Sequence, residues 1–356
     1  MAIYALWNNK GGVRKSYLTF QIACEYARTH PQYKVLVLDM CPQANASSML
    51  LGGVEKGERN LEEIMGSYPR KTIAGYINGR VLSPYVNPCI GAEYVLQIQP
   101  YNDAIPENIF LVSGDEDLEI QASRVAKACS PGPDDAWRIV HGWISDLIAD
   151  IRRSWNIEDT TVFIDCNPSF TIYTELAMSA SDRLIIPFSA DGSSKRAVRA
   201  VLSLLYGRGR SPGALKSEFH LQSERFRLSV PRIYCYVGNR LTQMNNSSAT
   251  AFKTVVAEIG QEIWEVWGAN SGLFYIHPLG QAVGQALPSH RTDFRKMFQA
   301  EICDANTASV VSSALGIPIS VLTAGKKKLS DKTITVNQTQ LDRQRPNLQD
   351  FVRTIE

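Results

Sequence analysis

The segment KGGVRKS at residues 10–16 constrains the fold of this 356-residue chain more than any other feature. It follows a short apolar run at residues 3–7. It precedes residues 16–30, where apolar side chains recur every four positions, as in an amphipathic helix. A continuous apolar run at 35–39 then predicts a strand that is covered on both faces. Strand, glycine turn, helix and strand in this order form a βαβ unit, which requires a parallel sheet with a right-handed crossover.

The same alternation of helix and strand continues along the chain. Helical spacing at residues 134–155 leads into an apolar run at 161–165, and further apolar runs occupy 184–188 and 232–237. This pattern predicts a doubly wound α/β fold, with a mostly parallel sheet and helices on both faces. Ligands of such sheets bind at the carboxyl ends of the strands, so the segments that follow the strands form the candidate site.

Two regions depart from this alternation. Residues 66–107 contain five prolines and several aromatic residues, which predicts a loop-rich insertion over the sheet. We expect one domain over residues 1–290 that includes this insertion, and a helical extension over residues 291–356 that packs on it. The extension ends in an amphipathic segment from Leu348 to Ile355, which lacks the basic face of a membrane-binding helix.

Composition argues against several classes of protein. No run approaches 18 uninterrupted apolar residues, and the N-terminus lacks the long apolar stretch of a signal peptide. We therefore expect a cytoplasmic protein rather than a membrane-spanning or secreted one. The seven cysteines include no C-x-x-C pair, which argues against a structural zinc site and a disulfide framework. A net charge of +2 is too small to imply a polyanionic partner.

Residues 10–16 lie where a phosphate-binding loop would join a strand to a helix. Gly11 and Gly12 let the backbone curl so that N–H groups converge on phosphate oxygens, and the following helix N-terminus adds its positive dipole end. In a P-loop of this kind, Lys15 neutralises the β- and γ-phosphates and the Ser16 hydroxyl binds Mg²⁺. A plain glycine turn is the alternative, and the lysine and serine at these positions argue against it.

Five segments together resemble one known family. The segment at 10–16 is similar to the deviant Walker A box, K-G-G-x-x-K-[S/T], of the ParA/MinD group of P-loop ATPases. Further similar segments follow in the family's order at 39–45 (DMCPQAN), 163–169 (FIDCNPS, similar to the Walker B strand and its loop), 184–188 and 238–240. The resemblance covers residues 1 to about 250.

The resemblance implies a homodimer that encloses ATP and Mg²⁺ between its subunits. It implies that nucleotide is bound by Gly11, Gly12, Val13, Lys15, Ser16 and Asn239, the last of these at the adenine. Lys10, Lys15 and Asp39 are the implied catalytic residues: Lys10 reaches the partner's phosphates, and Asp39 lies near the metal or the attacking water. Ser16 and Asp165 are the implied metal-binding residues, Asp165 acting through water.

Two positions differ from the family pattern. Arg14 stands where the family has glycine, at a point where the backbone passes close to phosphate. We expect its guanidinium to crowd the nucleotide or fill the phosphate site, although it could instead act as an extra phosphate ligand. Cys41 stands where the family usually has the aspartate that orients the attacking water. A neutral thiol orients water poorly, so hydrolysis should be slow, and we interpret Cys41 as a tolerated small residue rather than a nucleophile.

Basic residues are concentrated between Asp191 and Arg232, a stretch that contains nine basic and three acidic residues. ParA-type proteins bind DNA without sequence preference, and such a cluster can supply the phosphate-neutralising surface. The candidate DNA-binding residues are Lys195, Arg196, Arg199, Arg208 and Arg210. An ordinary solvated helix and loop is an equally favoured interpretation, and residues 326–328 form a further basic candidate.

The function that the resemblance implies is an ATP-driven switch for partition of DNA or positioning of cargo. ATP would drive dimerisation and DNA binding at the nucleoid, and a ParB-like protein or cargo adaptor would stimulate hydrolysis. A nucleotide-dependent scaffold or regulatory pseudo-ATPase with little turnover is the alternative, favoured by Arg14 and Cys41. An iron–sulfur reductase is set aside, because Cys166 follows Asp165 too closely for a cysteine at a dimer axis. Membrane binding of the MinD kind is only a minor alternative.

Overall fold

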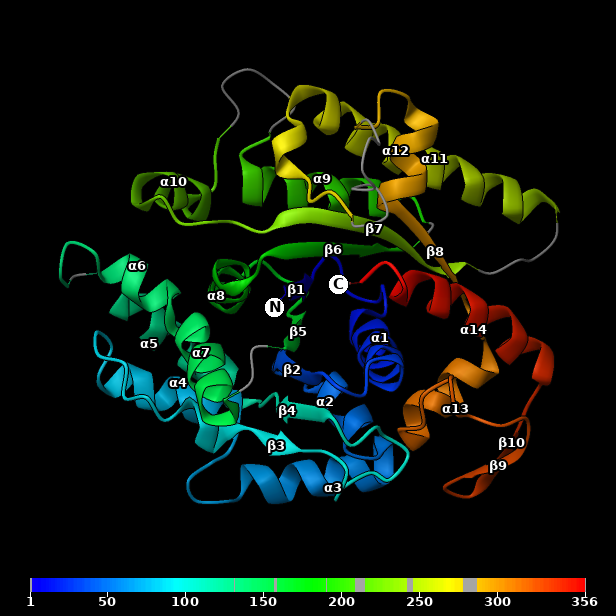
Figure 1. Cartoon of the computed structure of the whole chain (residues 1–356), viewed down its shortest axis with the longest axis horizontal. Helices are drawn as coiled ribbons and strands as arrows, with labels where there is room; N and C mark the ends of the chain where they lie inside the picture. Colours follow the sequence, from blue (N-terminus) through cyan, green and yellow to red (C-terminus); the bar gives the residue numbers. More distant parts are fainter. Residues whose placement is uncertain are drawn as a thin grey trace.

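The computed structural model describes residues 2–130, 132–156, 159–189, 191–208, 215–241, 246–277 and 287–355, with the backbone alone at 240–241 and 246–252. Its main sheet has eight strands in the order β3-β4-β2-β5-β1-β6-β7-β8 (Figure 1). These strands are β1 (Ala2–Leu6), β2 (Lys34–Met40), β3 (Leu96–Gln97), β4 (Ile109–Val112), β5 (Thr160–Cys166), β6 (Arg183–Phe188), β7 (Arg232–Leu241) and β8 (Gln299–Cys303). Every neighbouring pair is parallel except β3 and β4, so the predicted doubly wound α/β fold is confirmed.

Helices cover both faces of the sheet (Figure 1). They are α1 (Lys15–Thr29), α2 (Asn45–Leu50), α3 (Gly53–Met65), α4 (Ile73–Leu82), α5 (Asp117–Ala128), α6 (Ala136–His141), α7 (Trp143–Trp155), α8 (Ile172–Ala180), α9 (Ser194–Tyr206), α10 (Glu218–Phe226), α11 (Asn246–Ala269), α12 (Arg291–Phe298), α13 (Thr307–Leu315) and α14 (Gln338–Val352). Short 3₁₀ turns occupy Gly91–Tyr94 and Ser271–Leu273.

The central strands are apolar on both faces because each face packs on helices. In β2, Leu36 and Leu38 belong to the core beneath α4 to α9, whereas Val35 and Val37 belong to the core beneath α1, α13 and α14. This alternation follows from the two-residue period of a strand. Burial on both faces explains why the sequence shows a continuous apolar run here.

The expected domain pattern needs two corrections. Residues 66–107 are not loop-rich throughout, because α4 lies within them and Thr72 caps its N-terminus by accepting from Gly75 N at 3.1 Å. Residues 291–356 are not purely helical either. Strand β8 pairs in parallel with β7 and completes the main sheet, and β9 (Gly325–Leu329) and β10 (Lys332–Val336) form an antiparallel hairpin.

The C-terminal helix α14 packs on the body of the protein. Phe351, Val352 and Ile355 are buried with Leu348 in the core that also contains α1, and Tyr17 Oη donates to Gln344 Oε1 at 2.9 Å. Burying each large apolar side chain contributes about 1.5–3 kcal/mol, which keeps this segment on the protein. Across the described ranges, no helix is both long and apolar enough to cross a membrane.

Candidate functional site

A cavity of about 700 Å³ lies at the carboxyl ends of the central strands. One wall is the phosphate loop at Gly11, Gly12 and Arg14 to Tyr17, and another is the segment after β2 from Cys41 to Met49. The third wall is α13, from Ser309 to Ala314. The cavity therefore lies beside the carboxyl ends of the strands, where sheets of this kind bind their ligands.

The phosphate loop has an open inner face. Gly12 has φ +76°, a left-handed conformation that glycine adopts without a steric penalty, and a Cβ placed at Gly11 or Gly12 would meet no atom within 4 Å. Helix α1 begins at Lys15, directly after the loop, so its unpaired N–H groups and positive dipole end belong to the same site. This combination suits a phosphate group.

The Lys15 side chain is buried beneath the loop. Its Nζ donates to Lys10 O at 2.9 Å and to Asn8 O at 3.5 Å. Desolvation by burial lowers the pKa of Lys15, while the nearby Asp165 carboxylate acts in the opposite direction. The ammonium group is thus held by backbone carbonyl groups of the loop. A phosphate that entered the loop could replace these contacts.

Asp39 and Asp165 occupy paired positions on the adjacent strands β2 and β5. The two oxygens of Asp39 are engaged: Oδ1 accepts from Cys41 N at 3.1 Å, and Oδ2 accepts from the Ser47 N–H at 2.9 Å and its hydroxyl at 2.8 Å. Asp39 therefore anchors the start of α2. Desolvation raises the pKa of Asp39 above its ordinary value, and the bonds from Ser47 oppose this shift.

Asp165 retains an unused acceptor. Its Oδ1 accepts from Thr19 Oγ1 at 3.3 Å and the carboxylate is hydrogen-bonded by Ser16, but its buried Oδ2 has no partner among the described residues. Burial and the nearby Asp39 charge raise the pKa of Asp165 to about 7. A buried carboxylate oxygen beside a serine hydroxyl fits Mg²⁺, which usually takes one or two protein ligands and completes its shell with water and phosphate. The described residues contain no cluster of three or more His, Cys, Asp or Glu that could hold a metal ion.

Cys41 lines the cavity as a neutral thiol. Burial, together with the charges of Asp39 and Asp165, raises the pKa of Cys41 to about 12. A thiol that stays protonated at neutral pH is a poor nucleophile, in agreement with the interpretation of Cys41 as a tolerated small residue.

Lys10 has an acidic partner within its own chain, 181 positions away in the sequence. Its Nζ forms an ion pair with Asp191 and donates to Ser189 Oγ at 3.3 Å. Although desolvation opposes it, the bonds from Lys10 and Ser189 hold the pKa of Asp191 below its usual range. Lys10 therefore points toward the loop after β6 in the single chain.

The Arg14 guanidinium pairs with a carboxylate outside the phosphate loop, and the effect of Arg14 on a bound nucleotide stays a prediction. Its backbone is left-handed (φ 56°, ψ 42°), and its Nη1 donates to Asp304 Oδ1 at 2.8 Å. Asp304 follows β8 and precedes α13, so the side chain is drawn to the α13 wall of the cavity. The guanidinium also lies 5.9 Å from the centre of the Tyr17 ring.

Asn239 supports the phosphate loop. Its Nδ2 donates to Val13 O at 3.0 Å and to Arg14 O at 3.4 Å, from the end of β7. The side chain is buried and does not line the cavity, so its role toward an adenine stays a prediction.

The predicted DNA-binding residues do not form one uniform surface. Lys195 Nζ pairs with Glu258 at 2.9 Å and Glu262 at 3.7 Å, and Arg199 Nε donates to Glu262 Oε2 at 2.7 Å. Arg196 and Arg208 are exposed and form no ion pair with any residue that the structure describes. Arg210 lies outside the described residues.

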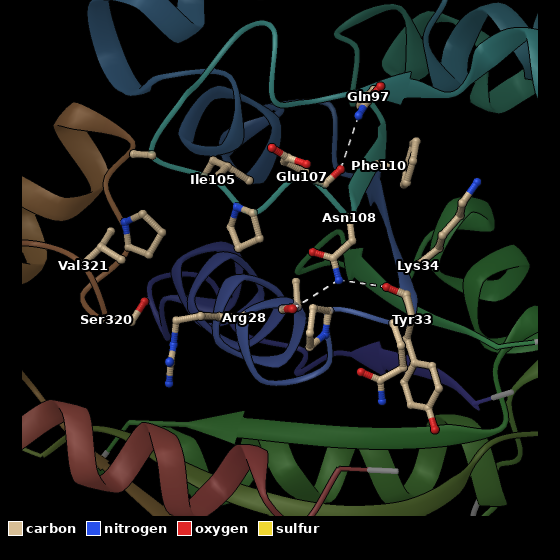
Figure 2. A pocket seen from close by; sticks show the side chains of 16 residues that line it. Arg28, Tyr33, Lys34, Gln97, Ile105, Glu107, Asn108, Phe110, Ser320 and Val321 are labelled. Atoms are coloured by element: carbon tan, nitrogen blue, oxygen red, sulfur yellow. Dashed lines mark hydrogen bonds between the residues drawn. The ribbon is translucent and has the colours of Figure 1, made fainter.

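A second cavity of about 690 Å³ lies at the opposite edge of the sheet, near the starts of β2 and β4 (Figure 2). Asn108 points across it and donates to Ala27 O at 3.2 Å and Tyr33 O at 2.8 Å. Lys34 Nζ lies 5.1 Å from the Phe110 ring centre. These contacts hold the end of α1 against the sheet, and none of the residues predicted from the motifs lies there.

Sequence reasoning missed the α13 wall and two carboxylates. Asp304 is 290 positions from Arg14 and Asp191 is 181 positions from Lys10, so no local pattern indicates either pair. Ser47 was also missed. A serine eight positions after Asp39, at the start of the next helix, is a signal that could have suggested it as an N-terminal anchor.

Comparison with known proteins identifies the family. Residues 1–206 match the AAA domain family model. A ParA family protein of Mycoplasma pneumoniae is 25% identical over 189 residues, which are 53% of this chain and 58% of that protein. The chromosome partitioning protein ParA of Caulobacter vibrioides is 27% identical over 191 residues, 54% of this chain and 57% of that protein. The chain thus matches little more than half the length of these relatives.

The fold has a solved counterpart. The structure of a Cyanothece McdA variant in complex with ATP has a TM-score of 0.54, with 15% sequence identity, over 100% of this chain and 98% of that one. This alignment spans the whole chain, so the likeness in fold extends beyond the matched N-terminal segment. With the Walker A and Walker B segments placed on one cavity, the chain belongs to the ParA/MinD-type P-loop ATPases.

Proposed function

We propose that this protein is an ATP-dependent switch of the ParA type, which binds ATP with Mg²⁺, dimerises and binds DNA without sequence preference. The observation that carries the proposal is the open phosphate loop above Lys15, beside the unpartnered buried oxygen of Asp165. Partition of DNA or positioning of a cargo, with a ParB-like protein or adaptor as partner, is the process in which such a switch acts. Its relatives are a ParA family protein and a chromosome partitioning protein.

Each residue of the site has a defined task in this proposal. The Gly11 and Gly12 backbone and the N-terminus of α1 bind phosphate oxygens, and Lys15 exchanges its carbonyl contacts for the phosphates. Ser16 and Asp165 hold Mg²⁺, Asp165 through water, and the metal supplies neutralisation of the phosphate charge when bound. Asp39 fixes the segment after β2 rather than activating water, because both of its oxygens are already engaged.

Hydrolysis should be slow. Cys41 is a protonated thiol, and both oxygens of Asp39 already accept hydrogen bonds, so neither side chain is a strong acceptor for the proton of an attacking water. The same two observations favour the second candidate function, a scaffold or regulatory pseudo-ATPase that binds nucleotide without appreciable turnover. The two functions differ in turnover and in whether DNA binding depends on ATP.

Arg14 should weaken nucleotide binding. Its side chain borders the phosphate loop at a position where the family has glycine, and its charge is shared with Asp304. A phosphate must therefore approach past a bulky group that is already paired. Replacing Arg14 by glycine removes this obstruction.

The test is ATP·Mg²⁺ binding and turnover measured side by side for the unsubstituted protein and Arg14→Gly. We expect the glycine variant to bind at least about tenfold more tightly, with slow turnover. Absence of ATP binding in both proteins would overturn the proposed function. Tighter binding by the unsubstituted protein would make Arg14 a phosphate ligand, and binding without turnover in either protein would favour the scaffold.

A further inference from the structure

Asp304 is built into a fixed position beside the phosphate loop. It is 5% exposed, and besides Arg14 its Oδ1 accepts from the Asn306 N–H at 2.9 Å and from Ser309 Oγ at 3.0 Å. These donors belong to the turn that starts α13, so the carboxylate is oriented before any guanidinium reaches it. The Arg14 side chain, in contrast, is 25% exposed.

Without the pair with Asp304, the Arg14 side chain could turn into the cavity. Arg14 lies between the loop glycines and Lys15, and its residue lines the cavity. Among the described residues that line the cavity, Glu58 on α3 is the one carboxylate that remains when Asp304 is removed. A guanidinium that turned toward Glu58 would enter the cavity that the phosphate loop also lines.

We propose that Asp304 is a positioning residue that holds the Arg14 guanidinium against the α13 wall and so keeps the phosphate loop accessible. This inference rests on the proposed nucleotide-binding function. The segment after β8, which contains Asp304, thus positions the Arg14 side chain. With glycine at position 14 there would be no side chain to position. The effect of Asp304 on nucleotide affinity therefore exists only when arginine occupies position 14.

A double-mutant cycle tests this coupling with a fluorescent N-methylanthraniloyl derivative of ADP and Mg²⁺. The four proteins are the unsubstituted chain, Arg14→Gly, Asp304→Asn and the double variant. We expect Asp304→Asn to bind about tenfold more weakly than the unsubstituted protein, and the double variant to match Arg14→Gly within about twofold. Asp304→Glu, which keeps the charge, should recover most of the affinity.

The outcomes separate this inference from the function on which it rests. If no variant binds the nucleotide, the proposed function is wrong. If Arg14→Gly binds but Asp304→Asn equals the unsubstituted protein, or if the loss persists in the double variant, Asp304 does not act through Arg14. Asp350→Asn removes a matched but exposed pair with Arg353 and should leave the affinity unchanged.

A variant that leaves Asp304 in place protects the test against misfolding of α13. Arg14→Met keeps much of the side-chain length but cannot pair with Asp304, so it should bind more weakly than the unsubstituted protein. Equal or tighter binding by Arg14→Met would contradict the inference. If Arg14→Gly also bound more weakly than the unsubstituted protein, the guanidinium would be a phosphate ligand and the inference would be wrong.

Discussion

At the scale of single residues, the backbone conformation at position 14 explains why the family has glycine there. Its φ of 56° lies in the left-handed region, where a residue with a Cβ costs roughly 1–2 kcal/mol. The pair with Asp304 offsets part of that cost, because it joins a partly exposed guanidinium to a buried carboxylate. The folded chain therefore tolerates this strain, and the backbone at position 14 keeps the left-handed conformation that glycine would adopt without strain.

Asp165 makes the stability of the protein depend on pH. Burial and the charge of Asp39 raise the pKa of Asp165 to about 7, above the value of about 3.9 for an unfolded aspartate. The folded state binds more protons than the unfolded state between these values. The stability that protonation provides is thus fully present below about pH 4 and is lost as the pH rises to about 7.

We predict that Asp165→Asn stabilises the nucleotide-free protein at pH 8, because an amide carries no charge to desolvate. The gain should be smaller at pH 5, where Asp165 is largely protonated. Urea unfolding at both pH values measures the difference, and each pH unit inside the window contributes at most about 1.4 kcal/mol. An equal gain at pH 5 and pH 8 would mean that titration of Asp165 does not set the pH dependence.

At the scale of elements, ion pairs between α9 and α11 show that part of the basic stretch from Asp191 to Arg232 is already neutralised. Glu258 and Glu262 on α11 neutralise Lys195 and Arg199 on α9. A cation that is already paired releases fewer counterions when it meets a DNA phosphate. The exposed Arg196 and Arg208 are therefore the stronger members of the predicted surface.

Substitutions in two matched pairs test this distinction. We predict that Arg196→Gln with Arg208→Gln reduces the slope of log affinity against log salt, for random duplex DNA with ATP, by about 0.9 per lost contact. Lys195→Gln with Arg199→Gln should change the slope less. Both pairs are substituted in the Arg14→Gly background, which we expect to bind nucleotide. Equal slopes for all variants would place the DNA-binding surface elsewhere, with the exposed Lys326 and Lys328 of the β9–β10 hairpin the next candidates.

At the scale of the whole molecule, Lys10 has one partner in the single chain and would have another in the proposed dimer. It is paired with Asp191 in the chain described here, so it must break that pair before it can reach a partner's phosphates. The pair is partly exposed, and exposed ion pairs are typically weak. A nucleotide phosphate at the dimer interface can therefore compete for the ammonium group.

We predict that ATP shifts Arg14→Gly from monomer to dimer, and that adding Lys10→Ala prevents the shift. Light scattering after size exclusion, with and without ATP·Mg²⁺, measures both. Lys296→Ala removes an exposed lysine on α12 and serves as the control that should still dimerise. A monomeric Arg14→Gly protein at saturating ATP would contradict the proposed dimer.

Local patterns determined much of the architecture before any contact was known. The buried runs at 35–39, 161–165, 184–188 and 232–237 lie on strands β2, β5, β6 and β7, because apolar continuity reflects burial on both faces. Strand β8 was missed, since residues 299–303 contain polar side chains that an edge strand tolerates. The short β3, of two residues, gives too little pattern to detect.

The sequence by itself predicted the phosphate loop with its lysine and serine, because these depend on neighbouring residues. The tertiary structure added the pairing of Asp39 with Asp165, which the parallel register of β2 and β5 creates. Only the tertiary structure decided which carboxylates hold Arg14, Lys10 and Lys195. Their partners lie 290, 181 and 63 positions away, and an ion pair forms wherever folding brings opposite charges together. Local sequence therefore determines what the site can bind, whereas the fold decides which of its cations are already engaged.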